Sequence, residues 1–154
     1  MMMKKGKVVF TLLIGAVVAA LAFIPTTKNP TTLFGENKKM EFFSEPWDDV
    51  LKEAKRTEKL IFVDLYAKWC GPCKLMKHYT FTNKEVAVFY NAHFINVALD
   101  GEKGKGAELM EKYSLRAFPS LLFLNAEGQL VVHRNGFHNP KQFTELGKQV
   151  QQLK

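Results

Sequence analysis

The sequence predicts an α/β fold with a central mixed β-sheet flanked by helices, and three observations lead to this prediction. Two near-continuous apolar runs, 60–66 and 94–99, are typical of central strands that are buried on both faces. Helical patterns before, between and after these runs favour a parallel pair of strands. Two further apolar runs, 121–124 and 130–132, flank a short loop with a glycine, which predicts a hairpin of antiparallel strands in the same sheet.

Helices are predicted where a capping residue or a proline precedes apolar side chains at helical spacing. Their starts are expected at Ser44 as the N-cap with Pro46 in the first turn, at 71 for a helix over 71–79, at Thr82 or Asn83, after the loop 101–106, and at Asn139 with Pro140. The last helix carries one apolar stripe, made of Phe143, Leu146, Val150 and Leu153.

The first segment, residues 1–24, has the layout of a secretory signal or a membrane anchor. Three lysines precede an apolar run from Val8 to Ile24, as in the basic and apolar regions of a signal peptide. Small residues would allow cleavage after Ala22, but an uncleaved anchor is the alternative because about 17 apolar residues can just span a bilayer. In both cases the domain is expected in the periplasm or another extracytoplasmic location, with membrane contact only through residues 8–24 if uncleaved.

Residues 25–44 are expected to form a flexible linker, because residues 25–39 are rich in Pro, Thr, Asn and Lys and have no apolar period. Residues 45–154 are expected to form one domain, and a chain with 47% hydrophobic residues and 13 Phe can build a compact core. The formal net charge is +7, but many lysines stand beside acids, as on a solvated surface. No nucleic-acid partner is expected, and the chain is expected to be a monomer.

The only two cysteines of the chain stand in the run Trp69-Cys70-Gly71-Pro72-Cys73, between a predicted strand and a predicted helix. Two thiols at this spacing can form a disulfide with each other and can pass it to another protein. Zinc is disfavoured because it usually needs four ligands, and the four histidines are scattered. An inert structural disulfide is disfavoured because so small a loop constrains the unfolded chain little. No metal or cofactor is expected, since the Cys70–Cys73 disulfide is itself the redox-active group.

The sequence resembles the thioredoxin family over about residues 45–153. The matching pieces are 62–74, which looks like the active-site stretch, Phe118-Pro119-Ser120, which looks like the segment with the cis-proline, and Gly136-Phe137, which looks like the glycine region that closes the substrate groove. The resemblance implies the thioredoxin fold and protein-disulfide oxidoreductase activity. In finer detail, 47–59 and 79–82 resemble the exported C-terminal domain of the transmembrane thiol:disulfide interchange protein and its stand-alone relatives.

In this reading, Cys70 lies at the exposed start of its helix, where free N–H groups favour a thiolate, and Cys73 is more buried. Cys70 is then the nucleophile, and Cys73 resolves the mixed disulfide. Asp64 is an acid in an apolar strand, and burial would raise the pKa of its carboxyl and make it a candidate proton acceptor for Cys73. The alternative is that Asp64 points to solvent at a strand edge.

The resemblance also implies a substrate-binding surface around the dithiol. Phe118 and Pro119 are expected to be joined by a cis peptide bond, beside which the backbone pairs with a substrate strand. Trp69 would supply an apolar lip, with simple packing as its alternative, and Gly71 and Pro72 complete the set.

Two residues depart from the family pattern. Thioredoxins usually have a proline five residues after the second cysteine, where this chain has His78. They also tend to carry a lysine that faces the buried aspartate from a neighbouring strand, and the best alignment places Asn96 there. The proton path and the pKa of the cysteines are therefore expected to differ from those of thioredoxins.

The function predicted from these residues is that of an exported thiol:disulfide oxidoreductase that reduces protein disulfides or relays electrons to them. Its expected partners are protein disulfide or dithiol substrates and a thiol electron donor. A disulfide-forming oxidase or isomerase is one alternative, although Gly71-Pro72 resembles reductases more than oxidases. A binding or chaperone module that uses the groove without turnover is another. The sequence names neither the substrate nor the electron donor.

Overall fold

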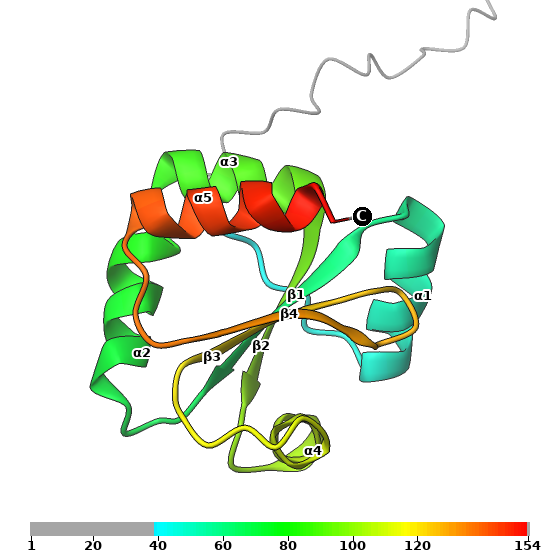
Figure 1. Cartoon of the computed structure of the whole chain (residues 1–154), viewed down its shortest axis with the longest axis horizontal. Helices are drawn as coiled ribbons and strands as arrows, with labels where there is room; N and C mark the ends of the chain where they lie inside the picture. Colours follow the sequence, from blue (N-terminus) through cyan, green and yellow to red (C-terminus); the bar gives the residue numbers. More distant parts are fainter. Residues whose placement is uncertain (1–38, 154) are drawn as a thin grey trace, which may run out of the picture. The chain divides into compact units, whose positions relative to one another are not determined.

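Four strands and a set of short helices make up residues 39–153, the part of the chain that the computed structural model describes (Figure 1). The strands are β1 (Leu60–Tyr66), β2 (Phe94–Asp100), β3 (Ser120–Leu124) and β4 (Leu130–Asn135). The helices are α1 (Trp47–Thr57), α2 (Gly71–Leu75) with its π-helical continuation η2 (Met76–Thr80), α3 (Lys84–His93), α4 (Gly104–Lys112) and α5 (Pro140–Gln151). No helix in this part is both long and apolar enough to cross a membrane.

The strands form one mixed sheet in the order β2-β1-β3-β4. β1 runs parallel to β2, to which it is joined through helices, and antiparallel to β3, while β3 and β4 form an antiparallel hairpin. The predicted mixed sheet is therefore confirmed, and β1 is an inner strand with a neighbour on each side. The segment with the cysteines follows β1, and the segment with the predicted cis-proline precedes β3. Both segments therefore adjoin inner strands of the sheet.

Helices cover both faces of the sheet, and the side chains of β1 alternate between the two faces as a strand requires. Ile61, Val63 and Leu65 pack into a core with side chains of α1 and α4. Leu60 and Phe62 pack into a second core with side chains of η2, α3 and α5. The same alternation places Asp64 on the second face, below the helix that carries the cysteines.

The second core is aromatic and is closed by α5, which lies side by side with α3 (Figure 1). The rings of Tyr90 and Phe143 stack with centroids 4.1 Å apart, and the Tyr90 hydroxyl donates a 2.8 Å hydrogen bond to the Phe143 carbonyl oxygen. Gly147 permits this close approach, because a Cβ there would lie 2.7 Å from a ring carbon of Phe89. The two helices thus hold the core over the face that carries Asp64.

The predicted helix starts are confirmed in part. Asn83 caps α3 by accepting hydrogen bonds from the Glu85 and Val86 N–H groups, and Asn139 caps α5 in a capping box with Gln142. The predicted Ser44 cap is wrong: the N-cap of α1 is Pro46, whose carbonyl oxygen accepts the first N–H groups of the helix. α4 begins at Gly104, inside the stretch 101–106 expected as a loop.

The segment 40–43 is bound to the edge of the sheet. The Met40 N–H donates to the Phe81 carbonyl oxygen at 2.8 Å, and the Phe43 N–H donates to the Asn96 carbonyl oxygen at 2.8 Å. Met40 is buried, so the predicted linker 25–44 ends earlier than expected and 40–43 belong to the domain. The predicted signal or anchor and most of the predicted linker lie outside the described residues.

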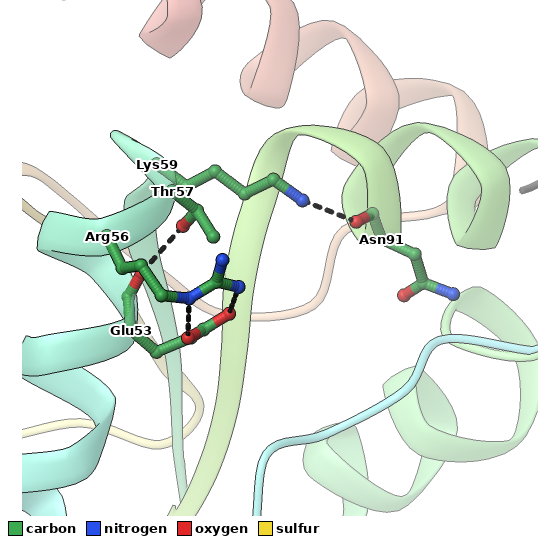
Figure 2. Close-up of polar contacts among 5 residues, drawn as sticks. All are labelled: Glu53, Arg56, Thr57, Lys59 and Asn91. Carbon is green, nitrogen blue, oxygen red and sulfur yellow. Dashed lines mark hydrogen bonds and ion pairs between the residues drawn. The ribbon is translucent and has the colours of Figure 1, made fainter. Parts of the chain in front are cut away.

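The turn after α1 is held by polar contacts (Figure 2). Arg56 forms a two-pronged ion pair with Glu53, and the Thr57 hydroxyl donates to the Glu53 carbonyl oxygen at 2.7 Å. Lys59 reaches across to α3, where its ammonium donates to the Asn91 carbonyl oxygen at 3.1 Å. The contacts of Glu53 lie within the last turns of α1, and the Lys59 contact links the residue before β1 to α3.

Candidate active site

The two cysteines lie where β1 has ended and α2 begins. They are joined by a disulfide, with their Cα atoms 5.4 Å apart. Cys70 is the N-cap of α2, and its Sγ accepts a 3.1 Å hydrogen bond from the Cys73 N–H. Pro72 suits the first helical turn because its missing N–H has no partner to lose there. The local sequence therefore fixes both thiols at the start of one helix.

The prediction that Cys70 is exposed and that Cys73 is more buried is wrong for this oxidised state. Cys70 is 3% exposed and Cys73 is 5% exposed, because Tyr66 and Phe118 pack against the pair. The two sulfurs differ in their surroundings instead. Cys70 receives the Cys73 N–H, whereas Cys73 lines a cavity that also contains Asp64.

Asp64 lies below Cys73 on the inner strand β1. The alternative in which it points to solvent at a strand edge is wrong, since Asp64 is 5% exposed. Its Oδ1 has no hydrogen-bond partner within residues 39–153. The cavity that it shares with Cys73 has a volume of about 600 Å³. Burial raises the pKa of the Asp64 carboxyl to about 7, and the positive charge of Lys77 opposes the rise.

The segment before β3 forms the other side of the site. The Phe118–Pro119 peptide bond is cis, as predicted. The Gly136 N–H donates to the Pro119 carbonyl oxygen at 2.9 Å, which ties the predicted glycine region to the proline segment. Gly136 has φ 82°, a conformation that side chains with a Cβ rarely adopt. Residues far apart in the sequence thus meet beside the dithiol.

Trp69 stands at the surface of the site, with 68% of its side chain exposed. Its indole N–H donates to Glu102 Oε1 at 2.9 Å, and its ring packs edge-on against Phe118 with centroids 5.9 Å apart. The exposed ring is available as the predicted apolar lip, and it also packs against Phe118. Gly71 and Pro72 are also exposed, so the predicted substrate-binding residues include an accessible surface next to the disulfide.

Comparison with known proteins identifies the family. A model of the thioredoxin-like domain family matches residues 47–151. The chain belongs to that family. The match covers α1 to α5, which includes the dithiol, Asp64 and the cis-proline segment.

Two curated relatives show the range of this thioredoxin-like domain. The thiol:disulfide interchange protein DsbD of Colwellia psychrerythraea is 31% identical over 107 residues, which is 67% of this chain but 18% of that protein. Thioredoxin-1 of Drosophila melanogaster is 38% identical over 73 residues, which is 47% of this chain and 64% of that protein. The chain therefore spans less than two thirds of the length of either relative.

Solved structures agree with this assignment. The solution structure of a candidate disulphide-isomerase from Bacteroides thetaiotaomicron is 38% identical, with a TM-score of 0.63 over 70% of this chain and 90% of that one. The oxidised C-terminal domain of Neisseria meningitidis DsbD is 27% identical, with a TM-score of 0.54 over 66% of this chain and 87% of that one. The chain is thus a thioredoxin-like domain of the disulfide oxidoreductase family.

One expected departure from other thioredoxin-like domains was placed at the wrong residue. Asn96 does not face Asp64, because the register pairs Asn96 with Phe62 and pairs Asp64 with Ala98. Asn96 instead donates to the Glu41 carbonyl oxygen at 3.3 Å and to the side chain of Asn91 at 3.1 Å. The strand position beside the buried acid therefore carries Ala98, which has no charge.

The second departure, His78, coincides with a change of helix type. The predicted helix over 71–79 is α-helical only to Leu75 and continues as the π-helix η2. The Phe81 N–H donates to the Met76 carbonyl oxygen at 2.9 Å, five residues back. The chain thus has an irregular turn in the redox helix without the proline that thioredoxins usually have there, and π-turns are frequent at functional sites.

Three further residues of the site were not predicted from the sequence. Gly101 makes room for Phe118, because a Cβ there would lie 2.5 Å from the Phe118 ring. Glu102 orients Trp69 through the hydrogen bond described above. Lys77 lines the cavity with Asp64 and Cys73, and its spacing of four residues from Cys73 was the signal that could have found it. Within residues 39–153, no group of three or more His, Cys, Asp or Glu side chains could hold a metal ion.

Proposed function

We propose that this chain is an exported thiol:disulfide oxidoreductase that reduces protein disulfides, or relays electrons to them, through Cys70 and Cys73. The observation that carries the proposal is the placement of Cys73 and the buried Asp64 on one cavity, directly behind a disulfide at the start of a helix. This arrangement supplies a nucleophile, a resolving thiol and a proton acceptor.

The first step of the proposed reaction uses Cys70. In the reduced chain, the Cys73 N–H that points at Cys70 Sγ stabilises a thiolate there. This thiolate attacks one sulfur of a substrate disulfide, so that a Cys70–substrate disulfide forms and the other substrate sulfur leaves as a thiolate.

The second step uses Cys73 and Asp64. The Asp64 carboxylate takes the proton of the Cys73 thiol, because its raised pKa makes it a stronger base than an exposed aspartate. The Cys73 thiolate then attacks Cys70 Sγ, the Cys70–Cys73 disulfide forms, and the second substrate sulfur leaves. Two electrons have passed from the dithiol to the substrate, and a thiol donor must reduce Cys70–Cys73 before the next cycle.

The surface around the dithiol is suited to an extended segment of a protein substrate. Trp69 and Phe118 offer exposed and half-buried aromatic area next to the disulfide. In this proposal the backbone beside Pro119 pairs with the substrate strand, so that affinity comes from main-chain hydrogen bonds and is tolerant of sequence.

The direction of electron flow is tested by equilibrating the chain with glutathione. A reductant is expected to have a potential nearer to about −270 mV, the value of thioredoxin, than to about −120 mV, the value of a strong oxidase. This difference is on the order of 7 kcal/mol for a two-electron couple, and it decides the direction against ordinary partners. A potential above about −180 mV would overturn the reductant assignment.

Disulfide isomerisation is the second candidate, and the similarity to the candidate disulphide-isomerase of Bacteroides thetaiotaomicron favours it. The same potential measurement separates the two, since an isomerase is expected near about −180 mV.

A non-catalytic binding module would keep the groove but would not turn over. Thiol titration after mild reduction, followed by reaction with a protein disulfide, distinguishes that case.

The roles of the two cysteines are tested with single serine variants. Cys73→Ser is expected to accumulate mixed disulfides at Cys70, because the resolving thiol is gone, whereas Cys70→Ser is expected to lose reductase activity without trapping partners. Trapping by Cys70→Ser alone would reverse the assigned roles.

Export is tested by removing residues 1–22. The truncated chain is expected to stay in the cytoplasm, because the segment that resembles a signal or anchor is gone. The size of the exported full-length chain then separates cleavage after Ala22 from anchoring. Export of the truncated chain would contradict this part of the proposal.

A further inference from the structure

The cavity behind the dithiol connects a buried acid with exposed basic side chains. Asp64 and Cys73 lie in its wall, and both are at least nine-tenths buried. The titratable groups that line it besides these two are Tyr66, Lys68, Lys74, Lys77 and His78. Because exposed and buried groups share one wall, and because the cavity is roomy and partly polar, it can admit water to Asp64.

The neighbouring strands contribute no charge at the level of Asp64. The residue paired with Asp64 on β2 is Ala98, and the one on β3 is Leu121. The segment 40–43 contributes Phe42 to the cavity wall. All cationic groups therefore come from the loop after β1 and from the redox helix.

Among these cations, Lys77 is the one that lies four residues, about one helical turn, after Cys73. Both side chains therefore lie on the same face of the redox helix, and both line the cavity. The positive charge of Lys77 acts on the Asp64 carboxyl and lowers its pKa against the effect of burial. Without this charge, burial would favour the neutral acid more strongly, and the neutral acid cannot accept a proton.

We propose that Lys77 is a positioning residue for the resolving step: its ammonium, carried on the redox helix instead of a neighbouring strand, belongs to the cavity that contains Asp64 and favours the carboxylate that takes the Cys73 proton. The proposal rests on the role of Asp64 in the proposed function. It assigns to the irregular turn η2 a chemical task, since Lys77 is the second residue of that turn.

The test compares full-length chains that carry Lys77→Met, Lys77→Arg or Lys74→Met. Lys74 is the matched control, because it lies on the same helix, lines the same cavity and carries the same charge. The rate of the resolving step is measured from pH 5.5 to 9 with a peptide disulfide in single-turnover mode. The pKa of Asp64 is measured separately by NMR titration of its carboxyl carbon in the oxidised chains.

Lys77→Met is expected to move the pH midpoint of the resolving step, and the Asp64 titration, upward by about half a unit. The rate below the midpoint then falls about threefold and the rate at pH 9 is unchanged, since half a pKa unit is about a threefold change in the charged fraction. Lys77→Arg and Lys74→Met are both expected to keep the wild-type pH profile of the resolving step. In an Asp64→Asn background, Lys77→Met is expected to have no further effect.

Two results would overturn the proposal while leaving the proposed function intact. One is an Asp64 titration that Lys77→Met does not move, and the other is an equal shift in Lys74→Met, which would indicate a general effect of net charge. Unchanged rates in Asp64→Asn alone would instead remove the proton-acceptor role of Asp64, and the role of Lys77 with it.

Discussion

Two buried polar side chains, Asp64 and Asn96, interrupt neighbouring apolar strands on the same face of the sheet, but their surroundings differ. Asp64 is 5% exposed and Asn96 is 4% exposed. Asn96 uses its amide N–H groups to bind the Glu41 carbonyl oxygen and the Asn91 side chain. The Oδ1 atom of each side chain is buried without a hydrogen-bond partner, but Asp64 carries an acid and lines a cavity together with Cys73.

The difference separates a structural role from a chemical one. A buried polar group that holds two segments together contributes to stability through its hydrogen bonds. A buried acid whose oxygen is left unpaired destabilises the fold whenever it is charged, so its retention calls for another reason. Burial and an unpaired oxygen are common to both residues, whereas the hydrogen bonds that Asn96 donates and the cavity beside Asp64 distinguish the two cases.

The largest expected effect is on stability as a function of pH in Asp64→Asn. Because the pKa of Asp64 is raised from 3.8 to about 7 in the folded chain, the folded state loses stability as the pH rises from about 4 to 7. The full loss, present above pH 7, is on the order of 4 kcal/mol. Asp64→Asn is expected to remove most of it, so the variant gains stability over the wild type at pH 8 and not at pH 4. Urea denaturation of the wild type and the variant at pH 4 and pH 8 measures this difference in the free energy of unfolding. The same difference at both pH values would contradict a raised pKa of Asp64.

The next effect is on the rate of the resolving step in the same variant. Asp64→Asn is expected to slow resolution near pH 7 about 100-fold, because an amide cannot take the Cys73 proton and a positioned base contributes at least that much. The effect is expected to shrink toward pH 9, where Cys73 ionises without help. Single-turnover kinetics across this range give the profile, with Asn96→Ala as the control that should keep the wild-type rate.

A third, smaller effect is expected on stability in Asn96→Ala. This variant removes the donor for the Glu41 carbonyl oxygen and loosens the segment 40–43, at a cost of about 2 kcal/mol. The loss should be the same at pH 5 and pH 8, because no titrating group is removed. A loss that varied with pH, or a slower resolving step, would break the comparison with Asp64.

The smallest effect concerns the contact between the turn after α1 and α3 (Figure 2). Lys59→Met is expected to lower stability by about 1 kcal/mol, because the half-buried ammonium no longer donates to the Asn91 carbonyl oxygen. Arg56→Gln is the matched control and is expected to change stability less, since the Arg56–Glu53 pair is exposed to solvent. Thermal denaturation ranks the two, and the reverse order would contradict the importance of burial here.

Most of the fold was predictable from the sequence because its signals are local. Apolar runs predicted the strands, Asn83 and Asn139 predicted two helix starts, and the spacing of the cysteines predicted the dithiol. The segment 40–43 was missed because it is too short to show a period and its hydrogen bonds go to partners that are distant in sequence.

The misplacement of Asn96 is an error in the register between two strands. Asn96 was placed opposite Asp64, but the parallel pairing of β1 and β2 is offset by two residues from that alignment. A shift of two keeps a side chain on the same face, so the pattern of apolar residues could not reveal it. Gly101 escaped notice for a similar reason, because its role depends on Phe118, which is distant in sequence.

The hydrogen bonds around the dithiol have a consequence for the proposed cycle, in which the Cys70–Cys73 disulfide opens and closes. Pro119 is tied to Gly136, and the Thr80 hydroxyl of the redox helix donates to the His138 carbonyl oxygen at 2.6 Å. These two bonds link the proline segment to the turn before α5 and link that turn to the redox helix, and neither bond involves a sulfur atom. In the proposed cycle, we therefore expect the proline segment to keep its position when the disulfide opens and closes.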